Sequence, residues 1–245
     1  MKFKTLALAA MMAIAAPSFA AIQTGGALGE GEYVFIATNS AGSYAQDLGV
    51  STDFIAALAA GTSFTQAVAG AEWDKFLAFG GTNTQWAIIA VQPLDVGFNP
   101  GEINAWTTRN VNQALGTIQN TQSNDGSSNL AAHFFDIDSL SSPKGANNRK
   151  ASAFGSLTYS DNGVTSFNSF FNARNAVGVE SELVYLTASN DTSDLPSMYT
   201  VLATTANFDG STVTLTSAVP EPSSYAMLFA GLAAVGFVAR RRKSV

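Results

Sequence analysis

The sequence contains no cysteine and only one histidine, and 12% of its 245 residues are charged. Without cysteine there is no disulfide, no thiolate-bound zinc or iron–sulfur cluster, and no cysteine nucleophile. A single histidine excludes metal sites built from several imidazoles. Basic residues are also scarce, with 12 Lys and Arg against 18 Asp and Glu, so the chain lacks the clustered cations that nucleic-acid binding requires. Nucleotide-binding glycine motifs and the Gly-x-Ser-x-Gly elbow of hydrolases are missing as well.

The N-terminus has the pattern of a secretory signal peptide. Lys2 and Lys4 precede an apolar run from Leu6 to Ala16, which is too short to span a bilayer. Ser18 and Ala20 are the small residues that signal peptidase accepts at the positions before its cleavage site. We therefore expect cleavage after Ala20 and export of the rest of the chain.

The C-terminus has three parts, a Pro-Glu-Pro triplet, an uncharged run and a basic cluster. Pro220, Glu221 and Pro222 form the triplet, which its two prolines hold extended and outside any helix. Residues 224–239 carry no charge, and we expect a transmembrane helix there. The last part predicts a stop-transfer signal and a cytoplasmic tail over residues 240–245, and its cations are Arg240, Arg241, Arg242 and Lys243.

Together these C-terminal features resemble the PEP-CTERM sorting signal of Gram-negative bacteria, over residues 219–245. The resemblance implies that an exosortase, a multi-pass membrane protease, processes the chain near the triplet. It also implies transient anchoring in the membrane and then delivery to the cell surface or the extracellular matrix. Pro220, Glu221 and Pro222 are then substrate and not catalyst. Bacteria with this system typically make exopolysaccharide, so the resemblance suggests a biofilm setting.

The chain between the two signals, residues 21–218, predicts one secreted α+β domain made mainly of antiparallel β-structure. Short β-branched and aromatic runs separated by turn residues indicate strands, and we expect them to form a sandwich. A few short helices are expected as well, and in the one over 72–79 we expect Trp73, Phe76 and Leu77 to face inward. The expected strands are 33–37, 86–91, 154–160, 164–171, 179–188, 199–206 and 212–217, and the expected helices are 52–60, 72–79, 110–122 and 129–137.

Candidate catalytic groups are few in this domain. His133 lies near Asp136 and Asp138, but its apolar neighbours favour a structural role. Glu180 and Glu182 form a second carboxylate pair, and on a strand residues two apart point to one face. Either pair has the residue types of a Ca²⁺ site or of a glycoside hydrolase, yet nothing in the sequence fixes the spacing of several ångström that hydrolysis requires. We assign no catalytic or metal residue, and weak Ca²⁺ binding stays open.

Three tryptophans, Trp73, Trp86 and Trp106, are the candidates for stacking on sugar rings. Each is equally a candidate for the core, and for Trp86, in the apolar run over 86–91, the core is the favoured place. Once both terminal segments are set aside, residues 21–219 hold six Lys and Arg against 17 Asp and Glu, a net charge of −11. Such a domain favours cations and repels anionic polymers.

The sequence thus predicts an exported surface or matrix protein with a structural or interaction role and no catalysis. Its expected partners are signal peptidase, an exosortase-type protease and exopolysaccharide, with no nucleic acid. The alternative is a secreted polysaccharide-acting hydrolase or a carbohydrate-binding module.

Overall fold

The computed structural model describes residues 31–93, 103–110, 149–154, 174–187 and 198–218, together with Leu232. These residues contain ten strands and two short helices. In chain order the elements are β1 (Glu32–Thr38), β2 (Gly42–Ser51), α1 (Thr52–Ala56), β3 (Ser63–Ala67), α2 (Ala71–Ala78), β4 (Gln85–Pro93), β5 (Ile103–Arg109), β6 (Arg149–Ala153), β7 (Asn175–Ala176), β8 (Ser181–Thr187), β9 (Met198–Phe208) and β10 (Thr212–Ser217).

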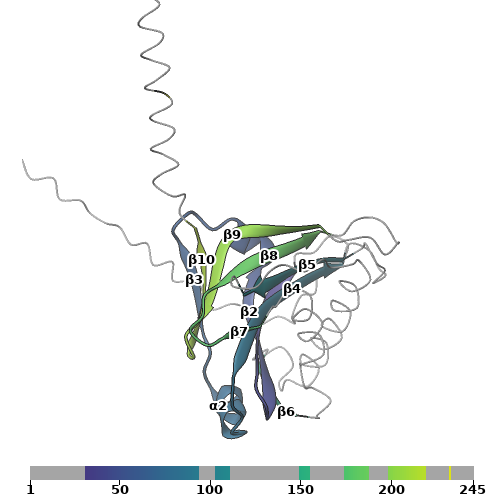
Figure 1. Ribbon diagram of the computed structural model, residues 1–245, viewed down its shortest axis with the longest axis vertical. Coiled ribbons are helices and arrows are strands. Elements are labelled where there is room, and N and C mark those ends of the chain that lie inside the picture. The colour runs from purple at the N-terminus through teal and green to yellow at the C-terminus, as the bar shows by residue number, and fades with distance from the viewer. Residues whose placement is uncertain are drawn as a thin grey trace, which may run out of the picture.

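All ten strands belong to a single sheet in the order β3-β10-β9-β8-β5-β4-β1-β2-β6, with β7 paired to β4. Every strand pair is antiparallel. The sheet is strongly curved, so that it forms an open half-barrel (Figure 1). The expected sandwich is therefore wrong, because the described strands follow one hydrogen-bonded path instead of two packed layers. The register shifts between β1 and β2 and between β8 and β9, with the extra residues on β2 and β9, and such irregularities raise local twist and bend a strand.

The inner face of the curve holds an aromatic core. Phe35 lies at its centre, with ring centroids 4.7 Å from Phe208 and 6.5 Å from Trp86. Tyr44 continues the cluster, with its ring 5.0 Å from that of Trp73. All five side chains are buried, and such pairs contribute about 0.5–1.5 kcal/mol each beyond the area they bury. This core holds the sheet in its curved shape.

The two helices lie where the sequence predicts them, although both are shorter or differently oriented than expected. Ser51 caps α1, its hydroxyl accepting from the Phe54 amide at 3.2 Å, and the helix ends at Ala56. In α2, Trp73 is buried as expected, but Leu77 is 55% exposed. Gly80 follows α2 with φ of 72°, the left-handed conformation of a helix C-terminus.

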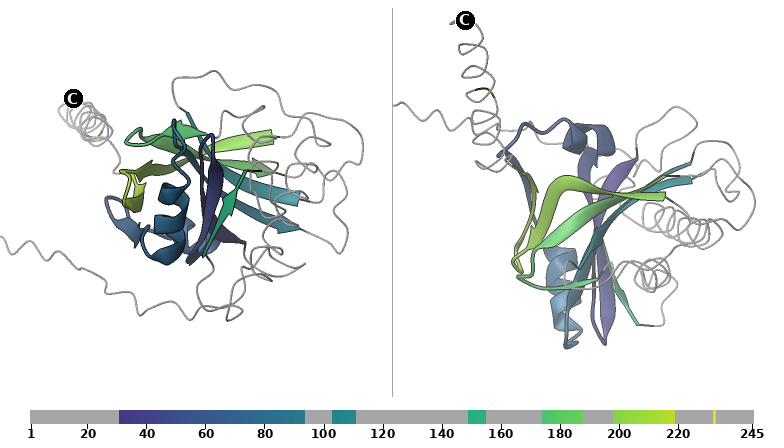
Figure 2. Two further views of the ribbon diagram at one scale, coloured as in Figure 1. Left: turned by 90° about the horizontal axis from the view of Figure 1, so that it is seen from below. Right: turned by 45° about the horizontal axis from the view of Figure 1, so that its top comes forward.

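Helix α2 lies between the two edge strands of the sheet, β3 and β6 (Figure 2). The Gln46 side-chain amide of β2 donates to the Ala67 carbonyl at the end of β3, at 3.0 Å. Arg149 of β6 donates to the Ala69 carbonyl at 2.8 Å. The Glu72 carboxylate of α2 accepts a hydrogen bond from the backbone amide of Ala151 in β6, also at 2.8 Å. These polar contacts bring the edges of the half-barrel together around the helix.

The predicted transmembrane helix over residues 224–239 is also corrected. In the described part of the chain, no helix combines the length and the apolar character that a membrane span requires. Only Leu232 of that segment is described. The segment is moreover short, because sixteen helical residues rise roughly 24 Å against a hydrocarbon core of about 30 Å.

The strands expected at 33–37, 86–91, 179–188, 199–206 and 212–217 are confirmed as β1, β4, β8, β9 and β10. The predicted elements at 129–137 and 164–171 lie outside the described residues. Those at 110–122 and 154–160 also lie outside them, except for their first residues, Asn110 and Phe154.

Candidate functional site

The junction between the sheet and the C-terminal segment is closely held. Strand β10 ends at Ser217, whose amide donates to the Thr62 carbonyl at 3.0 Å and whose carbonyl accepts from Gly61 at 2.9 Å. The next residue, Ala218, donates its amide to the Ala203 carbonyl of β9 at 2.7 Å. The chain is therefore fixed to the domain up to residue 218, two residues before the Pro-Glu-Pro triplet.

The predicted processing residues themselves lie outside the described residues. This holds for the signal-peptidase residues Ser18 and Ala20 and for the triplet Pro220, Glu221 and Pro222. It also holds for the basic cluster, which consists of Arg240, Arg241, Arg242 and Lys243. Their assignment rests on the sequence, while the structure contributes the junction that precedes the triplet.

Of the carboxylate pairs, only Glu180 and Glu182 are described, since His133, Asp136 and Asp138 lie outside those residues. Glu182 is on β8 and forms an ion pair with Arg109 of the neighbouring β5, with 3.5 Å between Nε and Oε2. Glu180 precedes the strand and is exposed. Within the described ranges no three His, Asp or Glu side chains gather as a metal site would need. The role of Glu182 that the structure shows is thus to join two strands.

The three tryptophans divide into two classes. Trp73 and Trp86 are 7% and 1% exposed and belong to the aromatic core. Trp106 of β5 is half-buried and stacks on Tyr185 of β8, with ring centroids 4.7 Å apart and an interplanar angle of 27°. Sequence reasoning missed Tyr185, because a tyrosine between Val184 and Leu186 is typical of any strand. Only the pairing of β5 with β8 reveals the stack.

Two buried tyrosines have structural roles. Burial raises the pKa of Tyr33 and of Tyr44 well above the ordinary value of a phenol. The Tyr44 hydroxyl donates to the Gln46 side-chain oxygen at 2.8 Å, and the Gln46 side-chain nitrogen in turn donates to the Ala67 carbonyl of β3. Both phenols therefore stay protonated, and neither is available as a base at neutral pH.

A shallow polar pocket lies at the turn between β1 and β2. Asn39, Ser40, Thr82 and Arg174 contribute to its lining. The Asn39 side-chain oxygen accepts from the amides of Ala41 and Gly42, and Ser40 accepts from the Thr82 amide at 3.1 Å. These polar groups are therefore engaged in holding two turns together.

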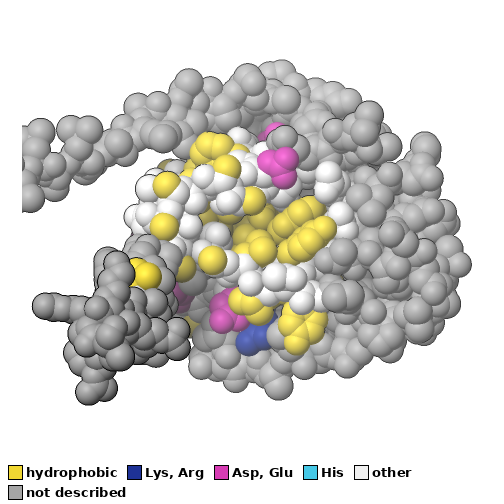
Figure 3. Space-filling view, turned by 90° about the horizontal axis from the view of Figure 1, so that it is seen from above, with side chains coloured by type: hydrophobic (Ala, Val, Ile, Leu, Met, Phe, Trp, Pro, Cys, Tyr) yellow, Lys and Arg dark blue, Asp and Glu magenta, His cyan; other side chains and the backbone are white. Residues whose placement is uncertain are grey.

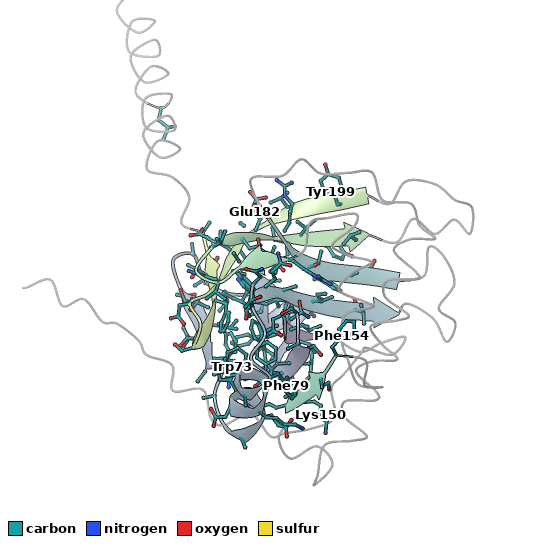
Figure 4. The ribbon with its side chains drawn as sticks, turned by 60° about the horizontal axis from the view of Figure 1, so that its bottom comes forward. Trp73, Phe79, Lys150, Phe154, Glu182 and Tyr199 are labelled. Carbon is teal, nitrogen blue, oxygen red and sulfur yellow. The ribbon has the colours of Figure 1, made fainter. Side chains whose placement is uncertain are left out.

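Charged side chains are few on the face seen in Figure 3. Its described area consists mostly of hydrophobic side chains and of the atoms drawn white, which are uncharged polar side chains and backbone. Figure 4 places Glu182 and Tyr199 on the β8–β9 side of the sheet, away from Trp73 and Phe79 at the α2 end.

The C-terminal segment matches the model of the PEP-CTERM protein-sorting motif over residues 218–243. The motif begins at Ala218, the last residue that the sheet holds. It implies export, sorting to the cell surface and processing by an exosortase-type membrane protease. No curated protein and no solved structure matches the chain. The resemblance found in the sequence is thereby confirmed for the C-terminal segment, and the fold carries no further assignment by likeness.

Proposed function

We propose that the exported domain has a non-catalytic structural or binding role in an exopolysaccharide-rich extracellular matrix. The observation that carries the proposal is the position of the sorting motif, which starts where β10 ends. A sorting signal attached directly to a folded domain is the arrangement expected for a cargo protein. In this role Pro220, Glu221 and Pro222 are recognised by the protease, and the domain is what is delivered.

Export begins with the N-terminal segment in this proposal. Residues 1–20 direct the chain to the export machinery, and signal peptidase cleaves after Ala20. Export also agrees with the absence of cysteine, because a domain without thiols folds in an oxidising compartment without forming disulfides.

A role in the matrix agrees with the charge of the domain. Six cations against 17 carboxylates between residues 21 and 219 leave a net charge of −11, which keeps the domain soluble and disfavours nucleic acid. Neutral or cationic polymers are the partners that such a charge permits.

The sorting step is tested by replacing Pro220, Glu221 and Pro222 together with alanine in a host that carries an exosortase. We expect the variant to accumulate unprocessed in the cell-envelope fraction, whereas the unaltered protein reaches the surface and matrix fractions. Replacing Pro196 with alanine is the matched control, because it removes a proline outside the motif. Processing and delivery of the triple variant at the normal level would contradict the proposal.

The matrix role is tested separately by washing. Protein that is integrated in the matrix stays with the extracted exopolysaccharide through high-salt washes, because neutral contacts are not screened. Quantitative release by salt, or recovery only as free protein in the medium, would contradict a matrix role without affecting the sorting step.

A further inference from the structure

The stacked pair Trp106–Tyr185 stands apart from the aromatic core. The two rings come from residues that face each other in the ladder between β5 and β8, and they lie 4.7 Å apart and nearly parallel. Trp106 packs partly against the core. Trp106 and Tyr185 are both half-buried, unlike Trp73 and Trp86. The pair is thus a rigid aromatic shelf at the border of the core.

The open side of this shelf is the side of β9. The register sets Tyr185 beside Thr200, a small residue that is exposed. Strand β10 pairs with β9 only from Thr204 onward. Among the described strands, none therefore lies beside Thr200 on the side of β9 that is turned away from β8. The two helices make their main contacts with β2 and β6, at the other end of the sheet. Among the described elements, no strand or helix therefore covers Tyr185 on the side of Thr200.

Uncharged polar groups lie next to the shelf. Gln92 of β4 and Asn104 of β5 are paired in register, and Asn104 is two residues from Trp106 and so on the same face of the sheet. Asn104 is buried, Gln92 is half-buried, and both are engaged in interactions within the chain. The surroundings of the shelf are thus uncharged, and an aromatic surface of this kind suits a ligand that has an apolar face.

A sugar ring has this chemistry, since its axial C–H bonds form an apolar face and its hydroxyls lie around the rim. A nucleobase also stacks on aromatic rings, but the −11 charge of the domain opposes a phosphate backbone. The same charge opposes polysaccharides that carry carboxylates or sulfates. The chemistry of the shelf and the charge of the domain together select a neutral glycan.

We propose that the Trp106–Tyr185 shelf on the inner face of the half-barrel is a binding site for a neutral polysaccharide chain. A sugar ring stacks on Tyr185 above Thr200, and Trp106 fixes the orientation of the tyrosine ring from behind. The inference rests on the proposed matrix function and names the site and the ligand class that serve it. When several copies of the protein bind along one polymer chain, the attachment to the matrix is multivalent, so weak binding at each single site suffices.

The test is affinity electrophoresis of the full-length exported protein, extracted from cells in a non-ionic detergent. Native gels contain hydroxyethyl cellulose, laminarin or dextran as neutral glycans, and alginate as the anionic comparison. We expect at least one neutral glycan to retard the protein and alginate to leave it unaffected. Tyr185→Ala should weaken binding roughly tenfold, and Tyr185→Phe should retain it because the ring face persists.

Two further variants separate binding from folding. Thr200→Arg places a long side chain over the ring while both aromatic residues remain, so it should abolish retardation without lowering the melting temperature. Tyr199→Ala is the matched control, because this tyrosine is 42% exposed and pairs with Leu186 on the opposite face of the same strands. It should bind like the unaltered protein.

The outcomes are decisive in both directions. Loss of retardation in Tyr185→Ala and Thr200→Arg, with Tyr199→Ala unchanged, supports the site. The proposal is overturned if no neutral glycan retards the protein, if only alginate does, or if the two shelf variants bind normally. Surface delivery is measured in the same strains: normal delivery of a protein that binds no glycan would overturn this inference and leave the sorting function standing.

Discussion

The contact between Glu72 and β6 offers the sharpest test of how the half-barrel is held together. The Glu72 carboxylate accepts the amide of Ala151, a residue that is 1% exposed, at 2.8 Å. Replacing Glu72 with alanine leaves a buried donor without a partner, which costs about 1–3 kcal/mol. We expect a loss near 2 kcal/mol in the free energy of unfolding, or roughly 4–8 °C in melting temperature for a domain of this size.

Two companion variants identify the cause. Glu72→Gln keeps an oxygen that can accept the Ala151 amide, so it should lose about 1 kcal/mol or less. Lys75→Ala removes only the exposed ion pair, whose charged atoms are 3.9 Å apart, and should change stability by at most about 0.5 kcal/mol. Urea unfolding of residues 21–218, followed by tryptophan fluorescence, measures all three. Equal losses in Glu72→Ala and Glu72→Gln, or in Glu72→Ala and Lys75→Ala, would refute the reasoning.

Three further predictions concern the core, a close approach and a turn. Phe76→Ala should cost about 3–5 kcal/mol in urea unfolding, because the ring is fully buried, while Leu77→Ala one residue later should be nearly neutral. Gly42→Ala should cost about 1–3 kcal/mol in the same assay, since a Cβ there would lie 2.6 Å from both the Phe79 ring and the Ser152 carbonyl oxygen; a neutral result would show that the two elements move apart freely. Hydrogen bonds from the Ser211 amide, the Thr212 amide and the Ser211 hydroxyl hold the pKa of Asp209 below its ordinary value. This stabilisation is present above the unfolded pKa of about 3.9 and is lost as pH falls through the lower folded value, so Asp209→Asn should reduce the acid dependence of melting below about pH 4, and an unchanged profile would contradict it.

The sequence predicts strands well where β-branched and aromatic residues dominate, as in β1 and β8. It misses β2, because Gly42 to Ser51 is rich in small and polar residues with low strand propensity. That strand forms because β1 and β6 pair with it on either side, and its backbone ladder outweighs its propensity. β3 and β5 are missed for similar reasons, as neither contains a long apolar run.

The sandwich was wrong for a different reason. Alternation shows that a strand buries one face, but it does not show whether successive strands continue one sheet or start a second. Here curvature lets a single sheet enclose its own core, with Trp73 and Phe76 of α2 supplying the remaining contacts. Leu77 was expected to point inward because it is apolar, yet the helix is covered on one side only.

The candidate binding site was predicted in part. Trp106 was one of three tryptophan candidates, and the sequence already favoured the core for Trp73, on the inward face of the helix over 72–79, and for Trp86, in the apolar run over 86–91. Exposure depends on which end of the sheet the helices cover, which is a tertiary property. The sorting motif, in contrast, is read directly from Pro220, Glu221 and Pro222, because a processing enzyme recognises a linear segment.

The tight hold on Ala218 has a consequence for delivery. All core residues of the described domain lie between Tyr33 and Leu215, so cleavage at the triplet or beyond leaves this described core intact. With one residue between Ala218 and Pro220, the protease acts directly beside the folded sheet, and the bulk of the sheet limits how far toward the N-terminus it can cut.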